Sequence, residues 1–144
     1  MLDKIYVVYW SQSGNTQAMA EAVGAGITAA GKEAAVVDVS SVSTAELKNA
    51  KAFALGCPAM GAEVLEEGEM EPFVTEVEGF AAGKTIGLFG SYGWGDGQWM
   101  RDWVDRMSSA GANVLNGEGG ICKEAPDDEA VAACTDLGRQ LAAV

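Results

Sequence analysis

The amino-acid sequence predicts an α/β fold in which a five-stranded parallel sheet is covered by helices on both faces. Apolar runs typical of strands alternate with helical patterns five times along the 144 residues. The strand runs are almost continuously apolar, which is typical of parallel strands buried on both faces. Because no linker, repeat or low-complexity stretch interrupts this alternation, we expect a single domain over residues 1–144.

The first half of the chain is expected to form three strands and two helices. Residues 14–30 show helical periodicity, and Gly31 is suited to end that helix. Ser43 or Thr44 is expected to cap a short helix that reaches Leu47, because a hydroxyl accepts a hydrogen bond from a free backbone amide. The apolar face of the first helix is expected to hold Ala18, Met19, Ala22, Val23 and Ile27. The three strands are expected at residues 4–10, 34–39 and 52–56.

The second half continues the alternation with three helices and two strands. The strands are expected at residues 85–90 and 112–121, the latter with a break near Asn116-Gly117. Residues 91–97 contain three glycines and are expected to form a loop, as is the Gly- and Glu-rich segment 57–68. The helices are expected near residues 69–78, at 98–109 and from 126 to about 142.

Composition and charge exclude several function classes. Lys and Arg number 9 against 21 Asp and Glu, so the net charge is −12 and a nucleic-acid partner is not expected. The absence of histidine removes the commonest general base and the usual zinc ligands. Cys57, Cys122 and Cys134 have no metal-binding spacing, and we expect neither a metal site nor a catalytic residue. No apolar run is long enough to span a bilayer and no signal peptide is evident, so a cytoplasmic, non-membrane protein is expected.

The loops that leave the first, third and fourth strands are expected to meet at one site. In open parallel sheets, ligands bind beyond the carboxyl ends of the strands at the point where the strand order reverses. The first of these loops, residues 11–16, consists of hydroxyl, amide and glycine residues between a buried strand and a helix N-terminus. Such neutral donors, together with the helix dipole, favour a bound phosphate. The loop lacks the lysine of a Walker A motif, so it suits a tethered monophosphate rather than phosphoryl transfer.

The other two loops offer contacts for a flat ring. Trp94 lies between two glycines with Tyr92 nearby, and Met60 precedes Gly61 in the loop after the third strand. A polarizable thioether packs well on an aromatic face. A phosphate cradle with two planar contacts and glycine-rich edges describes a heteroaromatic ligand with a phosphate tail.

These motifs resemble the flavodoxin family, specifically its short-chain members, over essentially the whole chain. The resemblance rests on Tyr9-Trp10-Ser11, Ser13-Gly14-Asn15-Thr16, Gly56-Cys57-Pro58-Ala59-Met60-Gly61 and Gly90-Ser91-Tyr92-Gly93-Trp94-Gly95-Asp96-Gly97. It implies a three-layer sandwich with strand order 2-1-3-4-5. It also implies a low-potential one-electron carrier with non-covalent FMN, cycling mainly between semiquinone and hydroquinone.

The resemblance also implies roles for individual residues. Met60 would cover the inner face of the flavin and Trp94 the outer face, and Glu63 would hydrogen-bond flavin N3. The carbonyl of Gly61 would turn toward flavin N5 on reduction, which a residue without a Cβ permits. The phosphate would be held by Ser11, Gln12, Ser13, Gly14, Asn15 and Thr16. The remaining cofactor-binding residues would be Pro58, Ala59, Ser91, Tyr92, Gly93 and Gly95.

Seven glutamates and no basic residue lie between Ala52 and Gly83. We interpret them as a solvated acidic face that disfavours the extra negative charge of the fully reduced flavin and so lowers the second potential. Such a face would also attract redox partners, reductases and oxidoreductases, with basic docking surfaces. The carrier itself is expected to be monomeric.

Two other functions are compatible with parts of the sequence. An FMN-dependent quinone or NAD(P)H reductase on the same fold would need room for a second planar substrate, which Trp94 should block. A phospho-receiver module would need an acidic pocket after the first strand, where this chain has Ser and Asn residues. We therefore expect an electron carrier and not an enzyme.

Overall fold

A computed structural model describes residues 4–12, 14–60, 64–93, 97–115 and 120–144. The strands are β1 (Lys4–Tyr9), β2 (Glu33–Asp38), β3 (Ala52–Gly56), β4 (Thr85–Tyr92), β5 (Asn113–Val114) and β6 (Gly120–Lys123). The helices are α1 (Asn15–Ala29), α2 (Thr44–Leu47), α3 (Met70–Glu78), α4 (Gln98–Ser109) and α5 (Asp128–Ala142), with a 3₁₀ turn at Val39–Ser41. No helix among these described segments has the length and apolar character that a bilayer crossing requires.

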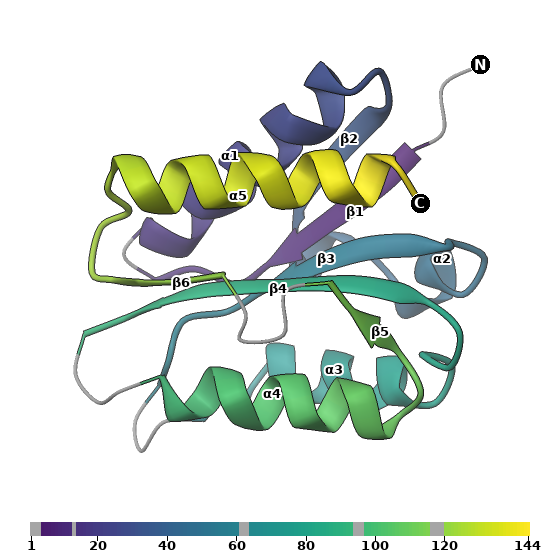
Figure 1. The fold of residues 1–144 in the computed structure, drawn as a ribbon. Coiled ribbons are helices and arrows are strands. Elements are labelled where there is room, and N and C mark those ends of the chain that lie inside the picture. The colour runs from purple at the N-terminus through teal and green to yellow at the C-terminus, as the bar shows by residue number, and fades with distance from the viewer. Residues whose placement is uncertain (1–3, 13, 61–63, 94–96, 116–119) are drawn as a thin grey trace.

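The strands form one parallel sheet in the order β2-β1-β3-β4-β5, with β6 also paired to β4. Helices α1 and α5 cover one face, and α3 and α4 cover the other (Figure 1). Successive strand residues point to opposite faces, so Val7 packs with the α1–α5 layer while Val8 packs with the α3–α4 layer. The predicted three-layer sandwich and its strand order are confirmed.

The layer of α1 and α5 is held by close backbone contact. A Cβ atom on Gly26 would lie 1.9 Å from the carbonyl oxygen of Thr135, and one on Gly138 would lie 2.0 Å from that of Val23. Only glycine lets the two helices approach so closely. Gly26 of α1 and Gly138 of α5 therefore serve the packing of these two helices.

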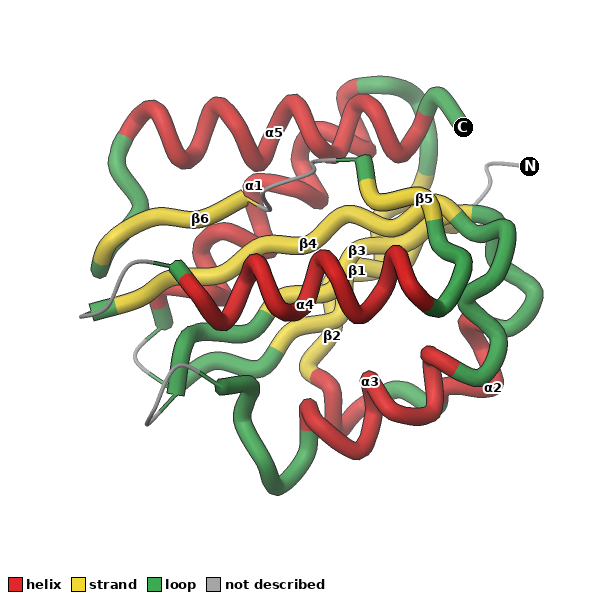
Figure 2. Tube along the Cα trace, turned by 60° about the horizontal axis from the view of Figure 1, so that its bottom comes forward, coloured by secondary structure: helices red, strands yellow, loops and turns green. Residues whose placement is uncertain are grey.

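The fifth position of the sheet is shared by two strands. β5 pairs with Thr85 and Ile86 at the start of β4, whereas β6 pairs with its last four residues (Figure 2). The break predicted within residues 112–121 agrees with these two segments, although residues 116–119 lie outside the described part of the chain. The second segment also runs past residue 121, to Lys123.

The structure corrects two expectations about individual elements, and in a third case it decides between two candidate cap residues. Ser91 and Tyr92, expected in a loop, extend β4 because β6 supplies partners for them. Ala18 is exposed, and Ala20 is buried in its place on the inner face of α1. Ser43, rather than Thr44, caps α2: its hydroxyl accepts from the amide of Ala45, and the Glu46 carboxylate accepts from the Ser43 amide.

Candidate functional site

The segments that leave β1, β3 and β4 meet at the carboxyl end of the sheet around a cleft of about 190 Å³. Its lining combines all three predicted loop regions with one residue that follows β6. The lining residues are Gln12, Asn15, Pro58, Ala59, Met60, Ser91, Tyr92, Gly93 and Glu124. The predicted convergence of the three regions is therefore present among the described residues.

The first loop is shaped around Gly14 and Ser11. Gly14 has φ 94°, a left-handed conformation, and no atom lies within 4 Å of the position a Cβ would take. The Ser11 hydroxyl oxygen accepts hydrogen bonds from the backbone amides of Gly14 (3.1 Å) and Gln17 (3.3 Å). With its oxygen engaged as an acceptor, the hydroxyl retains its own proton to donate. This hydroxyl therefore suits a ligand oxygen at the N-terminus of α1.

Thr16 is placed differently from the other residues of this loop. Its side chain is buried, and its hydroxyl oxygen lies 3.4 Å from that of Ser91. Gln12 is exposed and Asn15 is half-buried, and both line the cleft. The Thr16 side chain thus links α1 to the end of β4, while Gln12 and Asn15 present amide groups to the cleft.

The second loop is tied to its neighbours by backbone hydrogen bonds. The Ala59 amide donates to the carbonyl of Ser91 at 2.9 Å, which joins this loop to the end of β4. Met60 and Val64 exchange two backbone hydrogen bonds, of 2.8 and 3.0 Å, as an isolated antiparallel bridge. Met60 is half-buried at the cleft, so its thioether is available to a bound ring.

Cys57 precedes this loop, and its buried thiol is unreactive. Burial raises the pKa of its thiol to about 12, despite the hydrogen bond from the Glu66 amide, and the thiol donates to the Pro58 carbonyl. A thiol in this state is not a nucleophile at neutral pH. Cys57 therefore contributes to packing and to the course of the loop.

The glutamates of the acidic segment have separate structural roles. The Glu66 carboxylate accepts hydrogen bonds from the amides of Gly68, Glu69 and Met70, and thus binds the free amides at the N-terminus of α3. Partial burial raises the pKa of Glu66, but these three amides together lower it below its ordinary value.

Arg106 of α4 neutralises part of this segment. Its guanidinium donates to both oxygens of Glu71 and also pairs with Glu78 at 2.8 Å. Hydrogen bonding by Arg106 is the main reason that the pKa of Glu71 lies below its ordinary value. The seven glutamates of residues 52–83 therefore produce a weaker negative field than their number suggests. The charge that compensates part of them is that of Arg106, which lies on α4 and outside this segment.

Five of the sixteen predicted cofactor-binding residues lie outside the described part of the chain: Ser13, Gly61, Glu63, Trp94 and Gly95. Of the other eleven, eight line the cleft. Ser11 and Gly14 form the adjacent turn, and Thr16 is buried behind it.

Glu124 lines the same cleft and was not among the predicted residues. It lies directly after β6, and its amide donates to the carbonyl of Tyr92 at 2.7 Å. The sequence contains no local signal for this placement, since it depends on the pairing of β6 with the end of β4.

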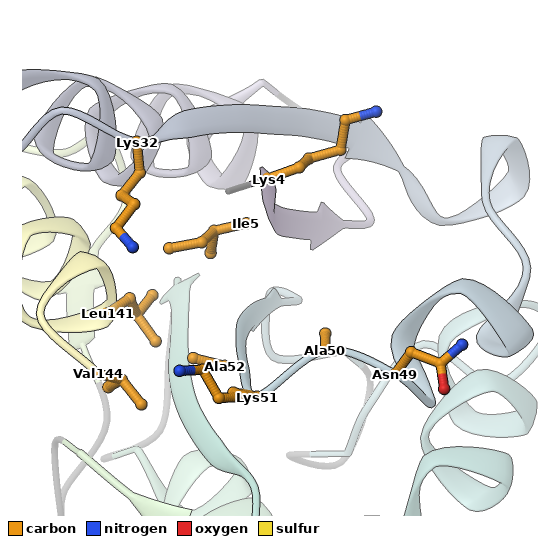
Figure 3. A pocket seen from close by; sticks show the side chains of 9 residues that line it. All are labelled: Lys4, Ile5, Lys32, Asn49, Ala50, Lys51, Ala52, Leu141 and Val144. Atoms are coloured by element: carbon orange, nitrogen blue, oxygen red, sulfur yellow. The ribbon is translucent and has the colours of Figure 1, made fainter. Parts of the chain in front are cut away.

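A larger cavity, of about 320 Å³, lies at the opposite, amino end of the sheet. Its walls include Ile5, Leu141 and three lysines, and the ammonium groups of Lys32 and Lys51 point into it (Figure 3). None of the three loop regions contributes to it. Lys4, Lys32 and Lys51 therefore lie far from the cleft.

Comparison with known proteins identifies the family. The family model described as Flavodoxin matches residues 7–137. The chain is 46% identical over 136 residues to a flavodoxin of Clostridium beijerinckii, covering 94% of this chain and 97% of that one. It is 41% identical over 138 residues to a flavodoxin of Megasphaera elsdenii, covering 96% and 98%.

Solved structures agree with this result. The solution structure of two-electron reduced Megasphaera elsdenii flavodoxin matches with a TM-score of 0.86 and 39% identity, over 97% of this chain and 99% of that chain. A flavodoxin from the domain Archaea matches with a TM-score of 0.86 and 33% identity, over 97% and 96%. The chain therefore belongs to the flavodoxin family, and it is an FMN-containing electron carrier of low potential rather than an enzyme.

Proposed function

We propose that FMN binds non-covalently in the cleft at the carboxyl end of the sheet, and that residues 1–144 form one domain around it. The observation that carries this proposal is the joint lining of one cleft by Gln12 and Asn15, by Pro58 to Met60, and by Ser91 to Gly93. When bound, FMN supplies the one-electron chemistry of the carrier. The protein supplies the site, the orientation and the electrostatic environment.

The phosphate of FMN is assigned to the loop of residues 11–16. The open space at Gly14 leaves room for a ligand oxygen. The Ser11 hydroxyl is oriented by the two backbone amides that donate hydrogen bonds to its oxygen. Gln12 and Asn15 supply uncharged amide donors. Thr16, with its side chain buried, would contribute through its backbone amide, and Ser13 completes the predicted set.

The flavin ring is assigned to the region between the second and third loops. Met60 supports this assignment, because it lines the cleft and is anchored to Val64. The roles of Trp94 on the outer face, of Glu63 at N3 and of the Gly61 carbonyl at N5 are proposed from the family resemblance. Gly93 and Gly95 would let backbone amides approach the pyrimidine edge.

A comparison of FMN with riboflavin, which lacks the phosphate, tests the phosphate assignment. Apoprotein is titrated with each ligand, and binding is followed by quenching of flavin fluorescence. We expect Ser11→Ala to weaken FMN binding by roughly tenfold, the equivalent of about 1.4 kcal/mol, because a hydrogen bond to a charged group is lost. Riboflavin affinity should hardly change.

The exposed Ser108 of α4 provides the matched control, since Ser108→Ala removes a hydroxyl outside the cleft. An equal loss of affinity for both ligands in Ser11→Ala would contradict the phosphate assignment.

A Trp94→Ala variant tests the ring assignment. It should weaken the binding of FMN and of riboflavin alike, because stacking involves the ring that the two ligands share.

We further propose that the redox partners of this carrier dock through basic surfaces. The net charge is −12, and the exposed carboxylates of Glu67, Glu69 and Glu124 lie on segments near the cleft, whereas three lysines surround the cavity at the opposite end. Opposite charges steer association and make its rate depend on salt.

Small oxidants of opposite charge test this second proposal. Reduced protein should react faster with hexaamminecobalt(III) as salt is lowered, and slower with ferricyanide. The same salt dependence for both oxidants would show that the field at the flavin edge is not negative.

A further inference from the structure

We propose that the cavity at the amino end of the sheet binds a small organic anion, which consists of a single carboxylate attached to an apolar body. The cavity has a volume of about 320 Å³. Small-molecule sites typically measure roughly 300–1,000 Å³, so it is large enough for such a ligand. It shares no lining residue with the cleft at the carboxyl end. This second site therefore does not depend on where FMN binds.

The cavity exists because two neighbouring strands diverge. β1 and β3 pair from Val7 and Ala54 onward, whereas Ile5 and Ala52, two residues earlier on each strand, both line the cavity. β1 remains paired with β2 along its whole length, and β3 remains paired with β4. The opening between β1 and β3 is thus built into the sheet and is not a feature of a surface loop.

One wall of the cavity is fixed by hydrogen bonds. The Lys84 ammonium group donates to the carbonyls of Lys48 and Ala50, both at 2.7 Å, and the Thr85 amide donates to the carbonyl of Lys51 at 2.9 Å. These bonds tie the turn before β3 to the start of β4. A ligand would therefore enter a preformed site, and little conformational freedom of the protein would be lost on binding.

The apolar part of the lining comes from β1, β3 and the end of α5. Ile5, Ala52 and Leu141 are buried, and Val144, which also lines the cavity, is 43% exposed. An apolar group that packs against these four side chains would be removed from water together with the exposed surface of Val144. Burial of this apolar area favours binding.

The polar part of the lining is positively charged. Three of the six lysines of this acidic chain line the cavity, and its described lining residues include no aspartate or glutamate. Lys4 is paired with Glu33 at 3.7 Å, whereas the ammonium groups of Lys32 and Lys51 point into the cavity (Figure 3). Two ammonium groups beside an apolar surface suit a carboxylate that carries an apolar body.

A nucleotide or a polyphosphate fits this cavity less well. Such ligands are bound by several backbone amides at once, typically at a helix N-terminus, and no described helix begins at a residue that lines the cavity. The net charge of −12 also repels a ligand with several negative charges more strongly than a ligand with one. The charge of the whole molecule therefore favours a monoanion.

4-Phenylbutyrate is a suitable probe, because it joins one carboxylate to an apolar body. It is titrated into FMN-loaded protein at low salt, and binding is followed by the methyl NMR signals of Ile5, Leu141 and Val144. We expect these signals to shift together and to saturate. Acetate, which has only the charge, and 4-phenyl-1-butanol, which has only the apolar body, should each bind at least fivefold more weakly.

Replacement of either lysine that points into the cavity tests the role of charge. Lys32→Gln and Lys51→Gln should each weaken the binding of 4-phenylbutyrate about threefold, since ion pairs that are accessible to solvent are individually modest. The matched control is Lys123→Gln, which removes an exposed lysine that does not line the cavity. It should leave the affinity for the probe unchanged.

Three results would overturn the proposal. Methyl shifts that do not saturate, or that occur away from the cavity, would show that the probe does not bind there. Equal affinities in Lys32→Gln, Lys51→Gln and Lys123→Gln would show that the two lysines do not hold a carboxylate. Release of FMN by the probe, followed by the flavin absorbance, would place the probe in the cleft at the other end of the sheet.

Discussion

The indole Nε1 of Trp99 donates a hydrogen bond of 3.0 Å to the carbonyl oxygen of Cys57, inside the protein. This bond joins α4 to the first residue after β3, from which the loop with Met60 leaves. Gly90 of β4 makes the contact possible, since a Cβ there would lie 2.1 Å from the same carbonyl oxygen. The course of the second loop thus depends on a residue 42 positions further along the chain.

Trp99→Phe is expected to destabilise the protein more than Trp103→Phe. Both indoles are buried, but within the described residues the Trp103 Nε1 has no hydrogen-bond partner. Loss of the Trp99 donor leaves the Cys57 carbonyl unsatisfied, which costs about 1–3 kcal/mol, whereas loss of the Trp103 N–H removes no bond. Urea unfolding of the two apoproteins measures the difference. Equal losses of free energy would show that the Trp99–Cys57 bond contributes little.

Gly14→Ala is expected to reduce both stability and FMN affinity. At φ 94° an alanine is strained even though there is space for its methyl group, and the cost should be about 1–2 kcal/mol. Gly31→Ala is the matched control, because Gly31 has φ 90° and open space but ends α1 away from the cleft. Both variants should lose similar unfolding free energy, and only Gly14→Ala should bind FMN more weakly. An FMN affinity unchanged in Gly14→Ala would exclude this turn from the phosphate site.

Glu66→Gln is expected to weaken the protein at neutral pH and to flatten its acid dependence. Although burial raises the Glu66 pKa, the amides that bind the carboxylate set it below the ordinary 4.5 in the folded protein. The stabilisation is therefore complete above the unfolded pKa and is lost as pH falls through the folded pKa. We expect a loss of about 0.5–2 kcal/mol at pH 7, as for other helix caps.

Urea midpoints at pH 7 and at pH 4 or below measure this effect. The gap between wild type and Glu66→Gln should shrink at acid pH. Glu67→Gln, at the exposed neighbouring position, should follow the wild type throughout. A pH profile of Glu66→Gln parallel to that of the wild type would show that the carboxylate contributes through its shape and not through its charge.

A single thiol is expected to react with a disulfide reagent in the native protein. Burial raises the pKa of Cys57 and of Cys134 to about 12, and both side chains are inaccessible. Cys122 is half-buried and its pKa is also raised by burial, so it should react slowly but first. Cys122→Ser should abolish the native reaction, and Cys134→Ser should leave it unchanged. Three thiols should react in denaturant; rapid labelling of Cys57 in native protein would refute its burial.

Local patterns in the sequence were sufficient for the order of elements and for the convergence of the three loop regions at one end of the sheet. Burial on both faces makes parallel strands continuously apolar, and each helix carries its own stop or cap, as at Gly31 and Ser43. Since parallel strands end at the same edge, the three loops could be assigned to one cleft. The uncharged residues after β1 were enough to predict a phosphate, because their chemistry is local.

The tertiary structure decided what depends on contacts between distant segments. Arg106 neutralises Glu71 across 35 positions, so the net field of the acidic segment could not be counted along the chain. Ser91 and Tyr92 became strand residues only because β6 pairs with them, and the same pairing brings Glu124 to the cleft. The sequence by itself determined which segments form strands and helices, through the periodicity of their apolar residues, and it determined the chemistry of each loop. Packing decided which side chains share a site, because periodicity carries no information about which distant residues meet.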